Sequence, residues 1–450
     1  MATSERECYP ESMIKRKLLV FCVAAPLSLH RLTAQDVPPA PTPQVHGVRE
    51  LLERAHAQTE LFSAAELLVR EAAAWQAQAG TLHNPVLGLE GGSVRTGGGD
   101  RIFGTGGAGS STAFQARVSQ SFYFPGRLDL RSELAGLEVD LARLSSEQLR
   151  RHVDARVIRL AYAFRAADQV TQHVSHRVER FRIMQAYLNG RPFLSPQSRA
   201  ERDIVEQRLR LLEQELAEML AMRERLWLRL NVYLVYPSEP ELRLSWFSDG
   251  VSFDRADFLA SALMNNPELK ERRILLEQRQ IEQRLARIYA YPDFAISAIY
   301  SSQNGSEREQ YFGLGIEMPI PLFDRGSHHT DVARARLESE RSALQFFERE
   351  LQAQMEEQLR THELALQRLR RFPLERLNEV RTRSLRLDRD FRTGRVALLT
   401  YMEADGEAFE SVRAVLQAQV EYVESHTRLL LLAGRSNLEP TNTAATEEVR

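Results

Sequence analysis

Residues 313–326, "GLGIEMPIPLFDRG", are followed by "SHHTDVARARLESE" at residues 327–340, and this stretch decides the fold. Its apolar residues Leu314, Ile316 and Met318 alternate with glycine and glutamate, which is the two-residue period of a β-strand. Two prolines and a glycine then form a corner that ends the strand, and a charged helix begins. We therefore expect a strand that turns sharply into a long helix. The corner residues are Pro319, Pro321 and Gly326.

The same plan occurs once more, earlier in the chain. A second alternating strand ends at the corner Pro125–Gly126 and is also followed by a long helical pattern. Each copy has another strand-like segment before it and a polar turn after it, at nearly the same offset, so the architecture is duplicated. The paired segments are "NPVLGLEGG" (84–92) with "YPDFAISAIYSSQNG" (291–305), "FQARVSQSFYFPGR" (114–127) with "YFGLGIEMPIPLFDRG" (311–326), and "LNGRPFLSPQSRAE" (188–201) with "FRTGRVALLTYMEAD" (391–405).

The strands have one apolar and one polar face. Segments of about ten residues with this alternation are typical of membrane β-barrel strands, and also of half-buried strands in a soluble sheet. Four strands are too few to close a barrel, and open edges in lipid are costly, so several chains would have to contribute. The polar residues that we expect to face a lumen are Gln115, Arg117, Ser119, Ser121 and Glu317.

Long helical hairpins follow each strand pair. Apolar residues recur every three or four positions from about 127 to 231 and again from about 327 to 434, turning at the two polar segments. Some sixty helical residues make a rod of roughly 90 Å. Pro373 predicts a kink in the third rod. A dimeric coiled coil would account for such helices, but not for the strands or the duplication.

The N-terminus resembles an export signal. A basic segment precedes an apolar core of about 12 residues and a small-residue exit, which predicts a signal peptide at 1–35, with the true start at Met1 or Met13. A proline-rich linker follows at 36–47. Both cysteines, Cys8 and Cys22, lie in the predicted signal, so the mature chain is expected to have neither disulfides nor a thiol metal site.

Composition and motifs argue against several functions. The formal net charge of −2 disfavours nucleic acid as a partner. The glycine-rich stretch 97–111 lacks the lysine of a phosphate-binding loop, and we interpret it as an outward-facing loop. His173 and His176, and the pair His328–His329, have no accompanying catalytic or metal-binding set. We therefore predict no enzymatic activity, no cofactor and no metal site.

The quoted segments, in their order and spacing over about residues 48–435, resemble the TolC family of outer-membrane efflux ducts, and "MPIPLFDRG" resembles the heavy-metal, CzcC-like branch. The resemblance implies a mainly α-helical fold with a small membrane β-barrel. It also implies a homotrimer, with a twelve-stranded barrel in outer-membrane lipid above a periplasmic helical tunnel. The expected partners are a periplasmic adaptor and an inner-membrane RND-type pump, with metal cations or small toxic compounds as substrates.

In this interpretation the chain has two repeats and a tail. The first repeat spans 48–266, with N-terminal helices, strands at about 84–95 and 112–124, a hairpin at 127–231 and an equatorial linker at 232–266. The second spans 267–435, with a helix at 267–290, strands at 292–302 and 310–319 and a hairpin at 327–434; the tail is 436–450.

The resemblance also implies site residues at the periplasmic end. Glu403 falls on an acidic position that rings the closed aperture in the family, Thr400 stands at the second such position, and Asp405 is a further contributor. The predicted adaptor-contacting tips are Gly190, Leu194, Gly394 and Leu398.

Three other functions remain compatible with the sequence. They are the outer-membrane component of a type I protein secretion system, a periplasmic helical scaffold without a pore, and a secreted enzyme.

Overall fold

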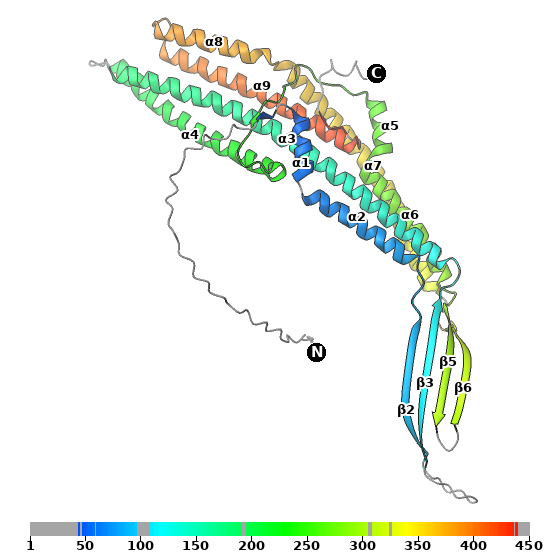
Figure 1. Cartoon of the computed structure of the whole chain (residues 1–450). Coiled ribbons are helices and arrows are strands. Elements are labelled where there is room, and N and C mark those ends of the chain that lie inside the picture. Colours follow the sequence, from blue (N-terminus) through cyan, green and yellow to red (C-terminus); the bar gives the residue numbers. More distant parts are fainter. Residues whose placement is uncertain are drawn as a thin grey trace, which may run out of the picture. The chain divides into compact units, whose positions relative to one another are not determined.

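The computed structural model describes one unit of the chain, within Thr42–Arg450 (Figure 1). The predicted signal peptide, most of the linker and of the tail, the loop at 97–108 and Leu194 lie outside the described residues. The described ranges are 44–45, 47–58, 60–96, 109–190, 195–304, 308–323, 326–435 and 437–439.

The order of elements repeats, as the sequence predicts: helix, two strands, then a long helical hairpin. The strand bounds differ from the predicted ones by one to three residues; β3, for example, begins at 109 instead of 112. The break between α7 and α8 falls at Pro373, as expected for a residue that lacks an amide proton. The first-half elements are β1 (Gln44–Val45), α1 (Val48–Gln58), α2 (Glu60–Ala79), β2 (Val86–Thr96), β3 (Gly109–Phe122), α3 (Arg127–Asn189) and α4 (Pro196–Leu234). The second-half elements are β4 (Glu241–Leu242), α5 (Arg255–Asn265), α6 (Pro267–Ile288), β5 (Phe294–Asn304), β6 (Arg308–Glu317), α7 (Ser327–Arg371), α8 (Glu375–Arg392) and α9 (Leu398–Leu432).

The strands of both halves form one antiparallel sheet in the order β2-β3-β5-β6. Residues opposite each other in the register share a face, so Leu89, Ala116, Tyr300 and Phe312 lie together on the apolar face. This face is open to solvent in the single chain, where Phe312 is 76% exposed. Within the described residues, the outer edges of β2 and β6 have no strand partner.

The two helices that follow the strands, α3 and α7, each begin at a left-handed glycine. Gly126 (φ 83°) caps α3 and Gly326 (φ 75°) caps α7, immediately after the strands β3 and β6 and their prolines. A side chain is strained at such φ values, and a Cβ on Gly326 would also lie 3.3 Å from the amide nitrogen of Ala290. The two Pro/Gly corners predicted from the sequence are therefore the points where sheet becomes helix.

The helices pack side by side along α3, which contacts α2, α4, α6 and α9 (Figure 1). The equatorial segment 232–266 contains β4, which pairs with β1, and the short helix α5. Its extended part is fastened to α9 by Gln419, which accepts from the Phe247 amide at 3.0 Å and donates to the Phe247 carbonyl at 2.8 Å. We call the segment 232–266 the belt. Its residues and those of the helices form the largest apolar cluster of the described chain.

Candidate functional site at the helical tips

The end of α3, the start of α4, the end of α8 and the start of α9 form a groove at one end of the helices. The groove has a volume of about 520 Å³ and is lined by residues of α3, α4, α8 and α9. Its apolar wall includes the exposed side chains of Ile183 and Tyr187, and it closes over the buried Tyr401. The groove therefore joins the first and second repeats at the turns that the sequence singled out.

Two of the predicted tip residues are exposed, and one is not. Gly190 ends α3, and Gly394 has a φ of 73° in the α8–α9 turn. Leu398 is only 7% exposed, because it packs between the hairpins in an apolar cluster. Leu398 nevertheless lines the groove, so its contact with an adaptor stays a prediction; the next residue, Leu399, is 66% exposed.

A buried ionic cluster fastens the start of α9 to α3. Asp405 is 3% exposed and accepts hydrogen bonds from Arg177 Nε at 2.9 Å and from Arg180 Nη2 at 2.7 Å. Arg177 is fully buried, and its guanidinium also lies over the ring of Phe409 at 4.4 Å. These contacts correct the prediction for Asp405, whose carboxylate points into the protomer and is engaged there.

Asp388 extends the cluster to α8. It accepts from the Tyr401 hydroxyl at 2.6 Å and lies 3.5 Å from Arg180 Nη1. Burial and the bond to this carboxylate both raise the pKa of Tyr401. Three helices, α3, α8 and α9, are thus tied together by charge-assisted hydrogen bonds just inside the groove.

The exposed face of α9 is acidic. Glu403 and Thr400 are both exposed, on the side of the helix away from Asp405. Glu407 and Glu410 continue this face at helical spacing and are exposed too. We did not predict these two residues from the sequence, although their spacing of four and seven residues from Glu403 is visible there.

The predicted lumen-facing residues share one face of the sheet. Gln115, Arg117, Ser119 and Ser121 alternate along β3, and Ser121 is opposite Ala295, which is opposite Glu317 on β6. The register therefore brings all five side chains to the face opposite the apolar one.

Several buried histidines lie outside the tips and were also missed. His362 Nε2 is 2.9 Å from the carbonyl oxygen of Val251, and His362 Nδ1 is 3.1 Å from Ser425 Oγ, which fastens the belt to α7 and α9. Because a carbonyl only accepts, Nε2 carries the proton of the neutral ring. The ring of His426 lies 5.5 Å from it, and burial lowers the pKa of His426 to about 3.

His173 lies nearer the tips. Its ring stacks on Phe409 at 5.9 Å, and burial lowers its pKa to about 4, with the Arg177 and Arg180 charges acting in the same direction. Among the described residues, no group of three or more His, Cys, Asp or Glu is placed to hold a metal ion. The helices of the described ranges include none that is long and apolar enough to cross a membrane.

Sequence comparison matches the second repeat to a known family. The model of the family "Outer membrane efflux protein" matches residues 258–435. No curated protein matches the sequence significantly.

Solved structures match nearly the whole chain. The Campylobacter jejuni CmeC outer membrane channel is 12% identical, with 89% of this chain and 88% of that chain covered and a TM-score of 0.69. CusC, in structures that describe conformational changes accompanying folding and transmembrane channel formation, is 16% identical over 91% of this chain and 100% of that chain, with a TM-score of 0.67. The open state of the Neisseria gonorrhoeae MtrE outer membrane channel is 15% identical, covering 86% and 89%, with a TM-score of 0.68.

These structural likenesses establish the fold, and the family match rests on the segment that contains β5, β6 and the second hairpin. Residues 258–435 therefore resemble the outer-membrane efflux protein family, and nearly the whole chain shares the fold of the outer-membrane channels.

Proposed function

We propose that the chain forms a homotrimeric exit duct of a tripartite efflux system, embedded in the outer membrane and reaching into the periplasm. The observation that carries this proposal is the four-stranded sheet, with an exposed apolar face and two unpaired edges, that continues into long helical hairpins. Joining the β6 edge of one copy to the β2 edge of the next satisfies both edges. Three copies then give a barrel of twelve strands, with the apolar face in lipid.

The same assembly provides a water-filled path. The face that carries Arg117, Ser119 and Glu317 then lines the barrel. Below it, the exposed acidic face of α9 lines the tunnel, with Glu403 and Thr400 at its narrow end. Three copies of an acidic ring would favour cations at this point.

The groove at the tips is the proposed docking site for the adaptor. It is open, bounded by both hairpins and lined by apolar side chains together with a few charged ones, which suits the tip of another helical hairpin packed against it. Gly394 lines the groove, and Gly190 ends α3, whose Tyr187 and Leu188 also line it. An RND-type pump would deliver the substrate through the adaptor. The segment "MPIPLFDRG" supports the CzcC-like branch, and with it metal cations or small toxic compounds as substrates.

The test is purification of the full-length protein from outer membranes. The expected result is a trimer by chemical cross-linking and native mass spectrometry, with ion conductance in planar bilayers. A monomer in mild detergent, or a trimer that does not conduct, would overturn the proposal.

A further inference from the structure

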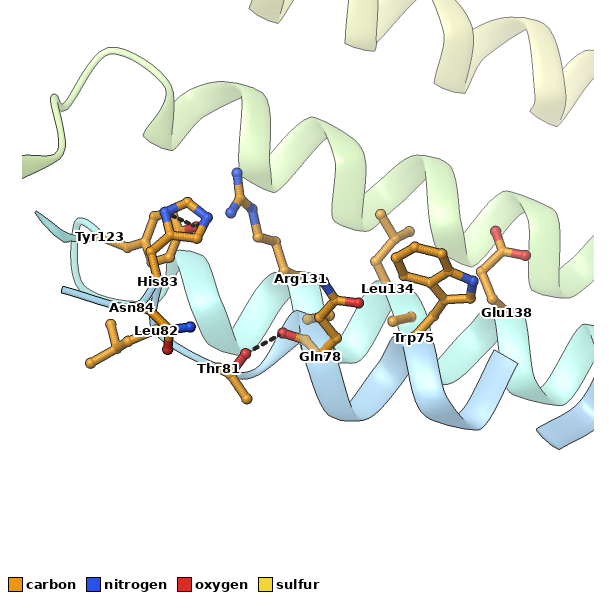
Figure 2. Close-up of a pocket in the computed structure, with 12 residues that line it drawn as sticks. Trp75, Gln78, Thr81, Leu82, His83, Asn84, Tyr123, Arg131, Leu134 and Glu138 are labelled. Carbon is orange, nitrogen blue, oxygen red and sulfur yellow. Dashed lines mark hydrogen bonds between the residues drawn. The ribbon is translucent and has the colours of Figure 1, made fainter. Parts of the chain in front are cut away.

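A pocket of about 590 Å³ lies where the sheet meets the helices, between the end of α2 and the start of α3 (Figure 2). It is lined by Leu82, His83 and Asn84, which precede β2, and by Tyr123, which follows β3. Trp75 of α2 and Arg131 of α3 complete its walls. The pocket is thus at the level where the apolar face of the sheet ends.

The faces of α3 show which way this pocket opens. Leu149 lies on the pocket side of α3 and packs against the apolar cluster that contains Leu51 of α1 and Leu438 of the C-terminal segment. The opposite side of α3 has the exposed carboxylates of Asp129 and Glu133, with further acids at helical spacing. In the proposed duct this exposed acidic side, where Glu133 also pairs with Arg284 of α6, borders the water-filled interior. The pocket therefore opens outward, on the side of the equatorial segment 232–266.

The polar groups of the pocket are arranged for an anion. The Arg131 guanidinium lies over the Tyr123 ring at 4.6 Å, and the Tyr123 hydroxyl is 2.6 Å from His83 Nε2. Within the described part of the chain, Arg131 makes no ion pair. Figure 2 shows Glu138 at the other end of the pocket, beside Trp75, and its carboxylate accepts from Gln278 Nε2 at 2.8 Å. The Glu138 carboxylate therefore does not pair with the Arg131 guanidinium, which is left available for an anion.

The apolar groups suit a lipid. Leu82 is exposed next to His83 and Asn84, and Trp75, which is 59% exposed, lies at the end of the pocket beside Glu138. Tryptophan and tyrosine favour the boundary between hydrocarbon and headgroups, where one end of the side chain is apolar and the other is hydrated. A guanidinium at the same level can bind a phosphate through two parallel hydrogen bonds.

We propose that this pocket, the corner pocket, binds the phosphate of a membrane phospholipid headgroup through Arg131, with Leu82 on the sheet side against the glycerol and the first carbons of the acyl chains and Trp75 on the other side against the headgroup. The proposal rests on the outer-membrane embedding proposed above. A neighbouring copy would join at the β2 and β6 edges of the sheet, whereas the pocket lies between α2 and α3 of one chain. It therefore stays open to lipid in the assembly.

The experiment measures lipid binding to the purified full-length trimer. Short-chain phosphatidylglycerol is titrated in detergent, and bound lipid is counted by native mass spectrometry. One tight site for each protomer is expected, and Arg131→Gln should weaken it about tenfold because one charge-assisted contact is lost. Arg131→Lys should retain most of the affinity. The matched control is Arg143→Gln, an exposed arginine on the other side of α3, which should bind like the wild type.

Two further arms separate the explanations. Inorganic phosphate, added at the concentrations at which phosphatidylglycerol saturates the site, should not displace the bound lipid. If free phosphate binds the site as well as the lipid does, the lipid assignment is wrong. Flotation with phosphatidylglycerol vesicles reports membrane insertion independently. If the protein forms trimers and floats, but Arg131→Gln binds lipid like Arg143→Gln, the corner pocket is not a lipid site. If it neither forms trimers nor floats, the proposed function fails and this inference fails with it.

Discussion

Replacing Asp405 by asparagine should loosen the start of α9 from α3. The carboxylate is the shared acceptor for Arg177 and Arg180, and Arg177 has no exposed surface. Asparagine keeps the shape but removes the charge, so it leaves a buried guanidinium largely uncompensated; Glu215, at 3.7 Å from Arg177, is the nearest remaining acid. Breaking a buried ion pair from one side costs about 3–5 kcal/mol. Because Arg180 is partly exposed and keeps Asp388, we expect about 3 kcal/mol.

The loss should be local. A cost of about 3 kcal/mol corresponds to an increase of roughly a hundredfold in the opening equilibrium of the affected segment. Hydrogen exchange with mass spectrometry should show this acceleration in peptides that cover residues 398–412, while those that cover 420–432 exchange as in the wild type. The control is Asp390→Asn, which affects a half-exposed pair with Arg395 near the same tip and should change exchange little.

A double variant separates charge from packing. Arg177→Met combined with Asp405→Leu replaces the buried pair by apolar side chains of similar size, which is often neutral or stabilising. It should recover most of the protection that Asp405→Asn loses. If exchange at residues 398–412 is unchanged in Asp405→Asn, or if the double variant is worse than the single one, the cluster does not hold α9 and the reasoning is wrong.

Other predictions concern the belt, the aperture and the barrel. The folded pKa of His426 lies below the ordinary value of 6.5, so only the unfolded chain takes up this proton as the pH falls. The free energy of unfolding should therefore fall as the pH is lowered from about 6.5 towards 3. His426→Phe should flatten the pH dependence of thermal unfolding. The control is His152→Gln, which replaces an exposed histidine and should leave that dependence unchanged. Glu403→Ala should reduce cation preference and divalent block in single-channel recordings; unchanged selectivity would place the constriction elsewhere. Cysteine at Ser119 should react with water-soluble thiol reagents much faster than cysteine at Val118 in the membrane-embedded protein, and equal rates would contradict a lumen on the polar face.

The strands and corners could be predicted because their signals are local. Alternation over ten residues sets the face of every side chain in a strand, and the φ values of Gly126 and Gly326 are ones that only glycine adopts without strain. The need to place most apolar residues on one face then restricts the register, and the sheet joins β3 of the first repeat to β5 of the second.

The role of Asp405 could not be predicted in the same way. Two residues that are two positions apart on an α-helix are rotated by about 200° around its axis. Glu403 and Asp405 therefore cannot both face the proposed aperture. Which of them is buried depends on Arg177 and Arg180, more than two hundred residues earlier in the chain. The sequence does contain one hint, because Tyr401, Asp405 and Phe409 share the spacing of a buried face.

Duplication in the sequence also suggests that the returning helices of the two repeats, α4 and α9, pack in the same way, but they do not. The returning helix of the first repeat, α4, packs on α3 and α1, whereas its counterpart α9 packs on α3, α7 and α8. A helix that packs on more neighbouring helices needs apolar residues on more of its sides, and α9 is accordingly buried on several sides. Gln419 and Tyr422 of α9 also accept hydrogen bonds from the equatorial segment 232–266. The charge-rich sequence of α4 has no such demand. The two hairpins therefore differ in composition because their proposed roles differ. On one side, α9 must hold the equatorial segment 232–266 and the ionic cluster, while on the other side it presents Glu403.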